Sequence, residues 1–290
     1  MILDSHCHAW EKWPYETRVP DPTSRAVADQ LIFEMDNNGV DRALVVCANI
    51  DRNPDNNRYV YEQLRRFPSR LIQIADVDCL WSTTYHTPGA DKRLEGAIRE
   101  LDLKGFTHYV AADDDGSWFT SAEGKRFFSV AARHNQLVSM AIPAKIIQKL
   151  LPIAETFPNT PFLLHHLGVG PVPGEGTKRI EEIERQLEFV RDAARLQNVH
   201  VKFSGFHHLA AQQWDYPFHD LRFIPRTLYS AFGPERLHWG SDFPVVAQYI
   251  TYRQSMKVFE SFCDFIPESD MKLILGDSLW TIIQKCGSTA

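Results

Sequence analysis

The sequence predicts a (β/α)8 barrel, and three observations predict it. Eight short apolar or β-branched runs recur along the chain, and stretches with helical periodicity separate them. The length of 290 residues is close to the roughly 250 residues that such barrels need as one domain. The predicted strands are Ile2–His6, Ala43–Cys47, Leu71–Asp78, Gly105–Val110, Leu137–Ile142, Phe162–Leu167, Val199–Ser204 and Leu237–Asp242.

Helical patterns fill the intervals between these strands. Strands that alternate with helices are joined by crossovers and therefore run parallel, and eight such units can close into a single barrel over residues 1–290. An open, doubly wound sheet is the alternative, but no glycine-rich nucleotide-binding motif follows a predicted strand. The predicted helices are Asp29–Asn38, Asn57–Phe67, Lys92–Leu101, Gly124–His134, Lys145–Phe157, Arg179–Leu196, Asp220–Phe232, Thr251–Phe265 and Ser278–Lys285.

Composition narrows the class of partner. The net charge is −6 and basic residues form no blocks, so neither nucleic acid nor an anionic membrane is an expected partner. No leader pattern and no run of about 18 apolar residues is visible, and the five cysteines are scattered without a CxxC pair. We therefore expect a cytoplasmic protein with reduced thiols that acts on a small molecule. The oligomeric state is left open, a homo-oligomer included.

The first predicted strand ends in a pair of histidines. Side chains alternate along a strand, so His6 and His8 point the same way and Cys7 points away from them. Two imidazoles at a strand end can bind a metal or a substrate oxygen. An HxH pattern is also common by chance, so its position at the carboxyl end of a first strand is what favours a functional site.

A second pair of histidines, His165 and His166, closes the sixth predicted strand. Successive strand residues face opposite sides, so we expect only one of them to enter the barrel and the other to pack between strand and helix.

The eighth strand runs into Gly240-Ser241-Asp242-Phe243-Pro244. At the mouth of a barrel, the Asp242 carboxylate could accept a proton from water or ligate a metal. The structural alternative is that Asp242 caps a turn, since Asp-x-Pro stretches are frequent turns.

Further candidates lie on or after other strands. His108 in the fourth strand and Lys202 in the seventh are candidate substrate-binding groups, and His207 and His208 follow the seventh strand, where a peripheral role is the more common one. Arg18, in an aromatic and charged loop after the first strand, is a candidate partner for a substrate carboxylate through its planar guanidinium.

Taken together, six ordered segments resemble the amidohydrolase-2 family of the amidohydrolase superfamily over nearly the whole chain. The nearest branch is that of the lactonases that open sugar lactones or 2-pyrone-4,6-dicarboxylate. The segments are Ile2–His8, Asn38–Ala43, His166–Gly168, Val201–Gly205, Phe232–Leu237 running into Gly240–Pro244, and Leu273–Asp277.

The resemblance implies a barrel of the metal-dependent-hydrolase kind, with His6, His8 and His166 at strand ends and Asp242 as the base. Metal-dependent relatives usually carry a histidine at the end of strand five. Here the segment Val138–Pro143, at the end of the fifth predicted strand, carries none, and no position for a carboxylated lysine is evident. A binuclear centre is therefore not expected. One Zn²⁺ on His6, His8 and Asp242, with His166 or His108 as a further ligand, and metal-free catalysis are equally compatible with the sequence.

The function that these features favour is hydrolysis of a small lactone of the sugar, muconate or pyrone type. Asp242 would activate water, and His166 would orient the substrate or stabilise the oxyanion. A nonoxidative decarboxylase that uses one Zn²⁺ is the alternative, and a barrel that binds a ligand without catalysis is the third. Tight stoichiometric Zn²⁺ would favour the decarboxylase, and turnover of a lactone after metal stripping would favour the metal-free lactonase.

Overall fold

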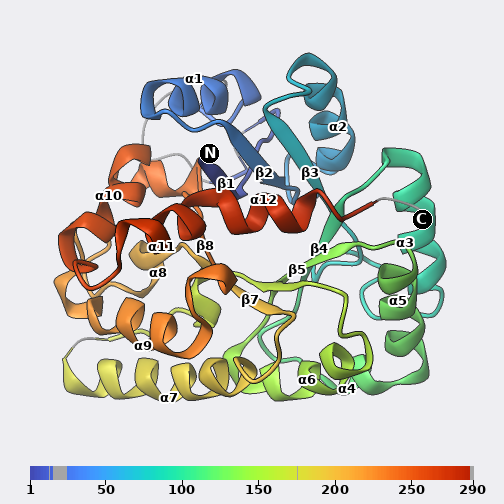
Figure 1. The fold of residues 1–290 in the computed structure, drawn as a ribbon. Helices are drawn as coiled ribbons and strands as arrows, with labels where there is room; N and C mark the ends of the chain where they lie inside the picture. The colour runs from blue at the N-terminus through green and yellow to red at the C-terminus, as the bar shows by residue number, and fades with distance from the viewer. Residues whose placement is uncertain (13, 16–24, 175, 288–290) are drawn as a thin grey trace.

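The computed structural model, which describes residues 1–12, 14–15, 25–174 and 176–287, is a (β/α)8 barrel, as the sequence predicts (Figure 1). All seven neighbouring strand pairs are parallel, in the sequential order β1 to β8. The strands are β1 Leu3–Cys7, β2 Arg42–Val46, β3 Leu71–Asp76, β4 Gly105–Tyr109, β5 Leu137–Ala141, β6 Phe162–Leu164, β7 Val199–Phe203 and β8 Leu237–Trp239.

Backbone hydrogen bonds bring the last strand back to the first. The amide of Asp242 donates to the carbonyl of His6 at 3.1 Å, and the amide of His8 donates to the carbonyl of Phe243 at 2.7 Å. The register between β1 and β2 shifts between Asp4 and Cys7, which marks a bulge at the carboxyl end of β1. This closure places the residues after β8 directly beside His6 and His8.

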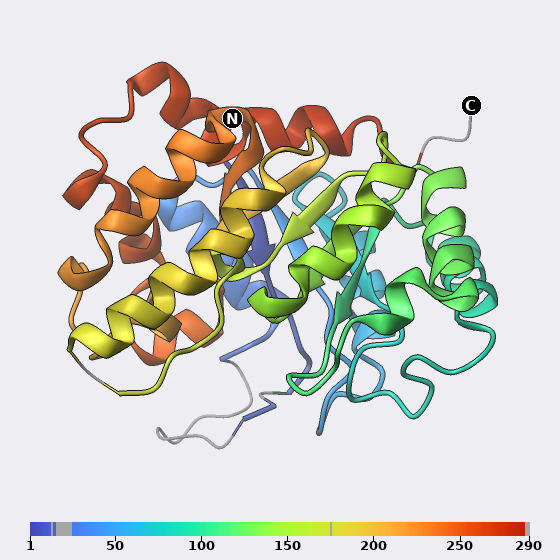
Figure 2. The ribbon, with the colours of Figure 1, turned by 90° about the horizontal axis from the view of Figure 1, so that it is seen from below.

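The helices surround the barrel (Figures 1 and 2). The nine predicted helices agree with observed ones to within a few residues, whereas the short helices α4, α8 and α11 were not predicted. Helix α1, for example, ends at Gly39, whose φ of 68° is a conformation that glycine adopts without strain. No helix of the described residues is both long and apolar enough to cross a membrane. The α-helices are α1 Ala28–Asn38, α2 Asn56–Arg66, α3 Ala90–Leu101, α4 Ser117–Thr120, α5 Ala122–Arg133, α6 Ile147–Thr156, α7 Thr177–Ala193, α8 Phe206–Leu209, α9 Phe223–Phe232, α10 Tyr252–Phe262, α11 Glu268–Lys272 and α12 Ser278–Ile283.

Two strands end three residues earlier than the sequence predicts, whereas the other strands end within two residues of the prediction. Strand β6 stops at Leu164 and β8 at Trp239, because His166 (φ 44°), Leu167 (φ 62°) and Asp242 (φ 61°) adopt the left-handed conformation. A left-handed residue turns the chain out of the pleat, so strict side-chain alternation no longer holds beyond these points.

The barrel interior changes from apolar to polar along its axis. Helix α12 lies across one end (Figures 1 and 2), where Leu279 and Ile283 are buried together with Leu3 and Leu137 at the starts of β1 and β5. Towards the carboxyl ends of the strands the buried groups are polar, Lys202 among them. Barrel enzymes carry their active sites at that end.

Candidate active site

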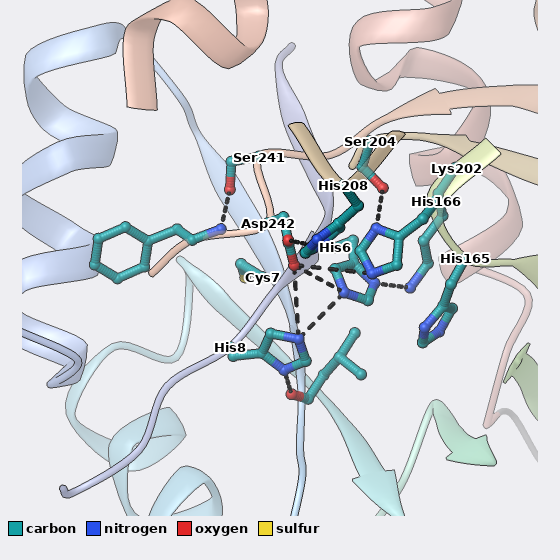
Figure 3. Close-up of polar contacts among 12 residues, drawn as sticks. His6, Cys7, His8, His165, His166, Lys202, Ser204, His208, Ser241 and Asp242 are labelled. Carbon is teal, nitrogen blue, oxygen red and sulfur yellow. Dashed lines mark hydrogen bonds and ion pairs between the residues drawn. The ribbon is translucent and has the colours of Figure 1, made fainter. Parts of the chain in front are cut away.

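A cluster of imidazoles surrounds one carboxylate at the carboxyl ends of the strands (Figure 3). His6 and His8 come from the end of β1, His166 follows β6, and His208 lies in α8 after β7. Asp242 follows β8, and its side chain points into the middle of the group.

Three of these side chains form a compact triad. The Nε2 atoms of His6 and His8 lie 3.2 Å apart, and they lie 3.5 and 3.9 Å from Oδ1 of Asp242. All three residues are buried. The structure thus brings together the three residues that the sequence singles out as candidate metal ligands.

Three more imidazoles approach the same carboxylate. Nε2 of His208 lies 2.9 Å and Nε2 of His207 3.2 Å from Oδ2 of Asp242, whereas Nε2 of His166 lies 3.9 Å from Oδ1. His166 and His208 are half-buried, so they form the side of the cluster that meets solvent.

Electrostatics divides the cluster into one anion and several neutral rings. Burial alone would raise the pKa of Asp242, but His166 and the contacts from the other imidazoles hold that pKa well below its usual range. Burial lowers the pKa of His8 to about 4 and that of His166 to about 3. Near neutral pH Asp242 is therefore ionised, and the His8 and His166 rings are uncharged.

Hydrogen bonds of the Nδ1 atoms with residues outside the cluster orient the rings. Nδ1 of His8 is hydrogen-bonded to the carbonyl of Val46, which can only accept, so Nδ1 carries the proton and Nε2 presents its lone pair to the cluster. Nδ1 of His166 lies 3.2 Å from Oγ of Ser204.

The triad suits one divalent metal ion. Two nitrogens and one oxygen separated by 3.2 to 3.9 Å match the spacing of ligands that each lie about 2.0–2.2 Å from a tetrahedral Zn²⁺. The lone pair of His8 already points inward. His6 can present its own if its Nδ1–H donates to a neutral Lys202 amine, and burial holds the pKa of Lys202 well below its usual range.

Both members of the second histidine pair reach the barrel mouth, so the expectation that only one would do so was wrong. The ring centroids of His165 and His166 lie 4.4 and 4.6 Å from that of His6. The reason is the left-handed turn at His166, which starts after β6 has ended and swings the second ring inward.

Lys202 lies beneath the cluster. Its Nζ is 2.6 Å from Nδ1 of His6 and 2.8 Å from Oγ of Ser139, which in turn lies 2.6 Å from Nε2 of His165. Lys202 is fully buried. Lys202 therefore contacts other residues of the site. The sequence instead predicts that it contacts the substrate.

His108 does not join the cluster, contrary to the prediction of a substrate-binding group or additional ligand. Its Nδ1 lies 3.1 Å from the carbonyl of Val77 and its Nε2 3.1 Å from Nε2 of His86, and its ring stacks near Trp118. The side chain is on the helix-facing side of β4, because strand residues alternate and Tyr109 is the one that turns towards His165. Arg18 lies outside the described residues.

The contributions of His165, His207 and His208 to the cluster were underestimated from the sequence. A signal was available: His207 and His208 follow Gly205 at the end of β7, the same strand-end position as the other site residues. Ser139 and Ser204, which hold His165 and His166, gave no comparable signal, because serine is common at strand ends.

A cavity of about 470 Å³ opens beside the cluster. Its walls come from the segments after β4, β5 and β6 and from helix α7, and His165, His166 and His208 line its inner side. Its volume is that of a site for a small organic molecule.

A search of curated proteins found no match. Solved structures, in contrast, include proteins with the same architecture. Among solved structures, an amidohydrolase from Burkholderia multivorans with bound zinc has a TM-score of 0.76 at 19% identity, covering 98% of this chain and 99% of that one. A probable 2-pyrone-4,6-dicarboxylic acid hydrolase from Acinetobacter baumannii with citric acid bound has a TM-score of 0.74 at 20% identity, with the same coverage. A 2,6-dihydroxybenzoate decarboxylase in complex with 2,6-dihydroxybenzoate has a TM-score of 0.68 at 13% identity, covering 98% of each chain.

At these identities the solved structures show a shared fold. The model of the family described as "Amidohydrolase" matches residues 3–277, which is nearly the whole chain. The chain therefore belongs to the amidohydrolase family.

Proposed function

We propose that this chain hydrolyses a lactone or a related carboxylic ester with water activated at Asp242. The observation that carries the proposal is the buried carboxylate of Asp242, whose pKa is held well below its usual range. Its neighbours His166 and His208 also line the cavity. Acyl hydrolysis needs such a group to take a proton from water beside a space for the carbonyl.

The reaction balances with the residues present. A water molecule next to Asp242 gives a proton to the carboxylate, or through it to His208 at 2.9 Å, as its oxygen attacks the carbonyl carbon. When the tetrahedral intermediate collapses, the ring C–O bond breaks and the same proton passes to the leaving alkoxide. The product is the hydroxy acid, and the carboxylate is regenerated.

Charge that develops on the carbonyl oxygen needs fixed donors. With Nδ1 of His166 accepting from the Ser204 hydroxyl, Nε2–H of His166 points into the half-buried side of the site, where it can donate to this oxygen. A divalent ion held by His6, His8 and Asp242 would, when bound, supply Lewis acidity at the carbonyl oxygen.

A second candidate is nonoxidative decarboxylation. It is favoured by the fit of the triad to one metal ion, and the dihydroxybenzoate decarboxylase of the same fold lends it support. Lactone hydrolysis is favoured by a base that is ionised beside the cavity, and by the likeness to the pyrone-dicarboxylic acid hydrolase.

The experiment is a panel of aldonolactones, muconolactones, simple lactones and pyrone carboxylates, followed by acid release with and without chelator. A parallel panel of hydroxybenzoates is followed by CO2 release. Turnover of a lactone that is lost in Asp242→Asn supports the proposal. CO2 release without any lactone turnover would replace it with the decarboxylase.

A further inference from the structure

The cavity beside the cluster can hold the substituent of a bound ester. His166 and His208 belong both to the cavity wall and to the shell around Asp242. A lactone whose carbonyl carbon lies near Asp242 can therefore direct part of its remaining atoms into this space.

Apolar groups form most of that wall. Val110 follows β4, Ile142 follows β5, Val169 follows β6 and Phe189 comes from α7. Small residues, Gly170 among them, leave the space between these side chains open. Substituent hydroxyls placed against such groups would lose their water contacts without gaining partners, which disfavours a polyhydroxylated ring.

The polar side chains on the α7 wall bind one another. Arg185 donates to Glu182 through Nε at 2.8 Å and Nη2 at 2.7 Å, so its charge is already paired. Gln186 donates to Glu182 at 3.2 Å and accepts from the amide of Gly170 at 2.9 Å. Lys145, at the exposed rim, is the one cavity cation that has no ion-pair partner among the described residues.

We propose, on the basis of the proposed lactone hydrolysis, that this cavity takes an apolar alkyl or aryl substituent. The substrate class is then a lactone with an apolar side group, preferred over aldonolactones, which carry several hydroxyls, and over pyrone dicarboxylates, which carry two negative charges. The apolar wall excludes the hydroxyls, and the one unpaired cation that the described part of the chain places at the rim does not match two carboxylates.

The first test is kcat/KM along the series γ-butyrolactone, γ-heptalactone and γ-nonalactone, with glucono-δ-lactone and 2-pyrone-4,6-dicarboxylate for comparison. Burial of each added methylene should raise kcat/KM by about fourfold until the cavity is full. Equal rates along the series, or a preference for glucono-δ-lactone or the dicarboxylate, would overturn the inference and leave lactone hydrolysis standing.

Substitutions in the cavity wall test whether the preference for longer substituents arises there. A Cβ at Gly170 meets only Gln186 Oε1 at 3.7 Å, so Gly170→Val should fold and occupy part of the cavity. Phe189→Ala removes part of the apolar wall. Each should lower kcat/KM for γ-nonalactone about tenfold and leave γ-butyrolactone within twofold. Phe33→Ala is the control, since Phe33 lies on α1 with 57% of its surface exposed, and it should change neither rate.

Binding separates this inference from the proposed function. 3-Alkylcyclopentanones keep the ring and place the chain as a γ-alkyl lactone does, but they have no ester bond. Calorimetry gives their affinities whether or not any lactone is turned over. Affinity that rises with chain length and falls in Gly170→Val supports the apolar cavity even if hydrolysis fails. Affinity that is independent of chain length would refute it.

Discussion

Nζ of Lys202 lies 2.6 Å from Nδ1 of His6, and both side chains are fully buried. The contact fixes the plane of the His6 ring and couples its tautomer to the protonation of the amine, because one nitrogen must donate and the other accept. Ser139, 2.8 Å from the same Nζ, holds the amine from the other side. Lys202 is thus a positioning residue for the cluster.

Lys202→Met should separate activity from stability. Methionine is of similar length and needs no hydrogen bonds, so the cost of burying the amine is removed and the melting temperature should not fall greatly. Activity should fall about 10–100-fold, because the partner that orients His6 is lost. Steady-state rates and thermal unfolding measure the two effects.

The matched control is Lys104→Met. Lys104 donates to the Cys286 carbonyl at 2.7 Å, near the end of the chain and far along the barrel from the cluster. This variant should keep its activity. Wild-type turnover in Lys202→Met would show that His6 needs no such support.

Metal binding should saturate at no more than one Zn²⁺ per chain. His6, His8 and Asp242 form one of three candidate groups among the described residues, and any two of these groups share a residue, so they compete for ligands. The thiol of Cys7 instead donates to the carbonyl of Leu44. Zinc calorimetry on protein stripped with chelator should therefore lose its signal in His8→Gln and keep it in Cys7→Ser. Two ions per chain, or loss of binding in Cys7→Ser, would show that the ligands are others.

The stability of the fold should fall in mild acid partly through His200. Burial, with a smaller effect from Arg236, lowers its pKa to about 3, against an unfolded value of about 6.5. Between these values the unfolded chain binds a proton that the folded chain does not, so stability decreases as the pH is lowered through this window. For this one group the loss from pH 7 to pH 5 is about 2 kcal/mol.

Urea unfolding at pH 7 and pH 5 measures the free energy of unfolding at each pH, and thus the contribution of His200 to its loss in acid. His200→Gln should lose about 2 kcal/mol less than the wild type between the two values, whatever the substitution costs at pH 7. His219→Gln, at an exposed position, is the control and should behave as the wild type. If His200→Gln and the wild type lost the same free energy of unfolding between pH 7 and pH 5, the acid sensitivity would arise from other groups.

The strands and helices were predictable because their signals are local. Buried parallel strands such as Phe162–Leu164 are short apolar runs, and helices such as Thr177–Ala193 show a regular period. The ends of β6 and β8 were not predictable. The left-handed conformations of His166 and Asp242 depend on the tertiary contacts that hold them, and neither residue type requires that conformation. The assignment of residues 1–290 to a single domain stays a prediction.

The site was predictable only where strand ends dictate it. His6, His8 and Asp242 lie at or just after the carboxyl ends of strands that meet at one mouth, so their proximity follows from topology. The prediction for His108 was wrong because the sequence alone does not show which of the alternating side chains of β4 face the barrel interior. The position of Lys202 beneath His6 depends on which inward residues share a level of the barrel, and that is set by register between strands.

The rate of Asp242→Asn on a confirmed substrate is the most direct test of the central claim. Asparagine has the same shape and, like aspartate, tolerates the φ of 61° at this position, so the backbone and the melting temperature should be retained. Removing the general base should lower kcat by roughly 10²–10⁴-fold. Near-wild-type turnover in a folded Asp242→Asn protein would contradict the account, because the carboxylate would then do no more than hold its turn.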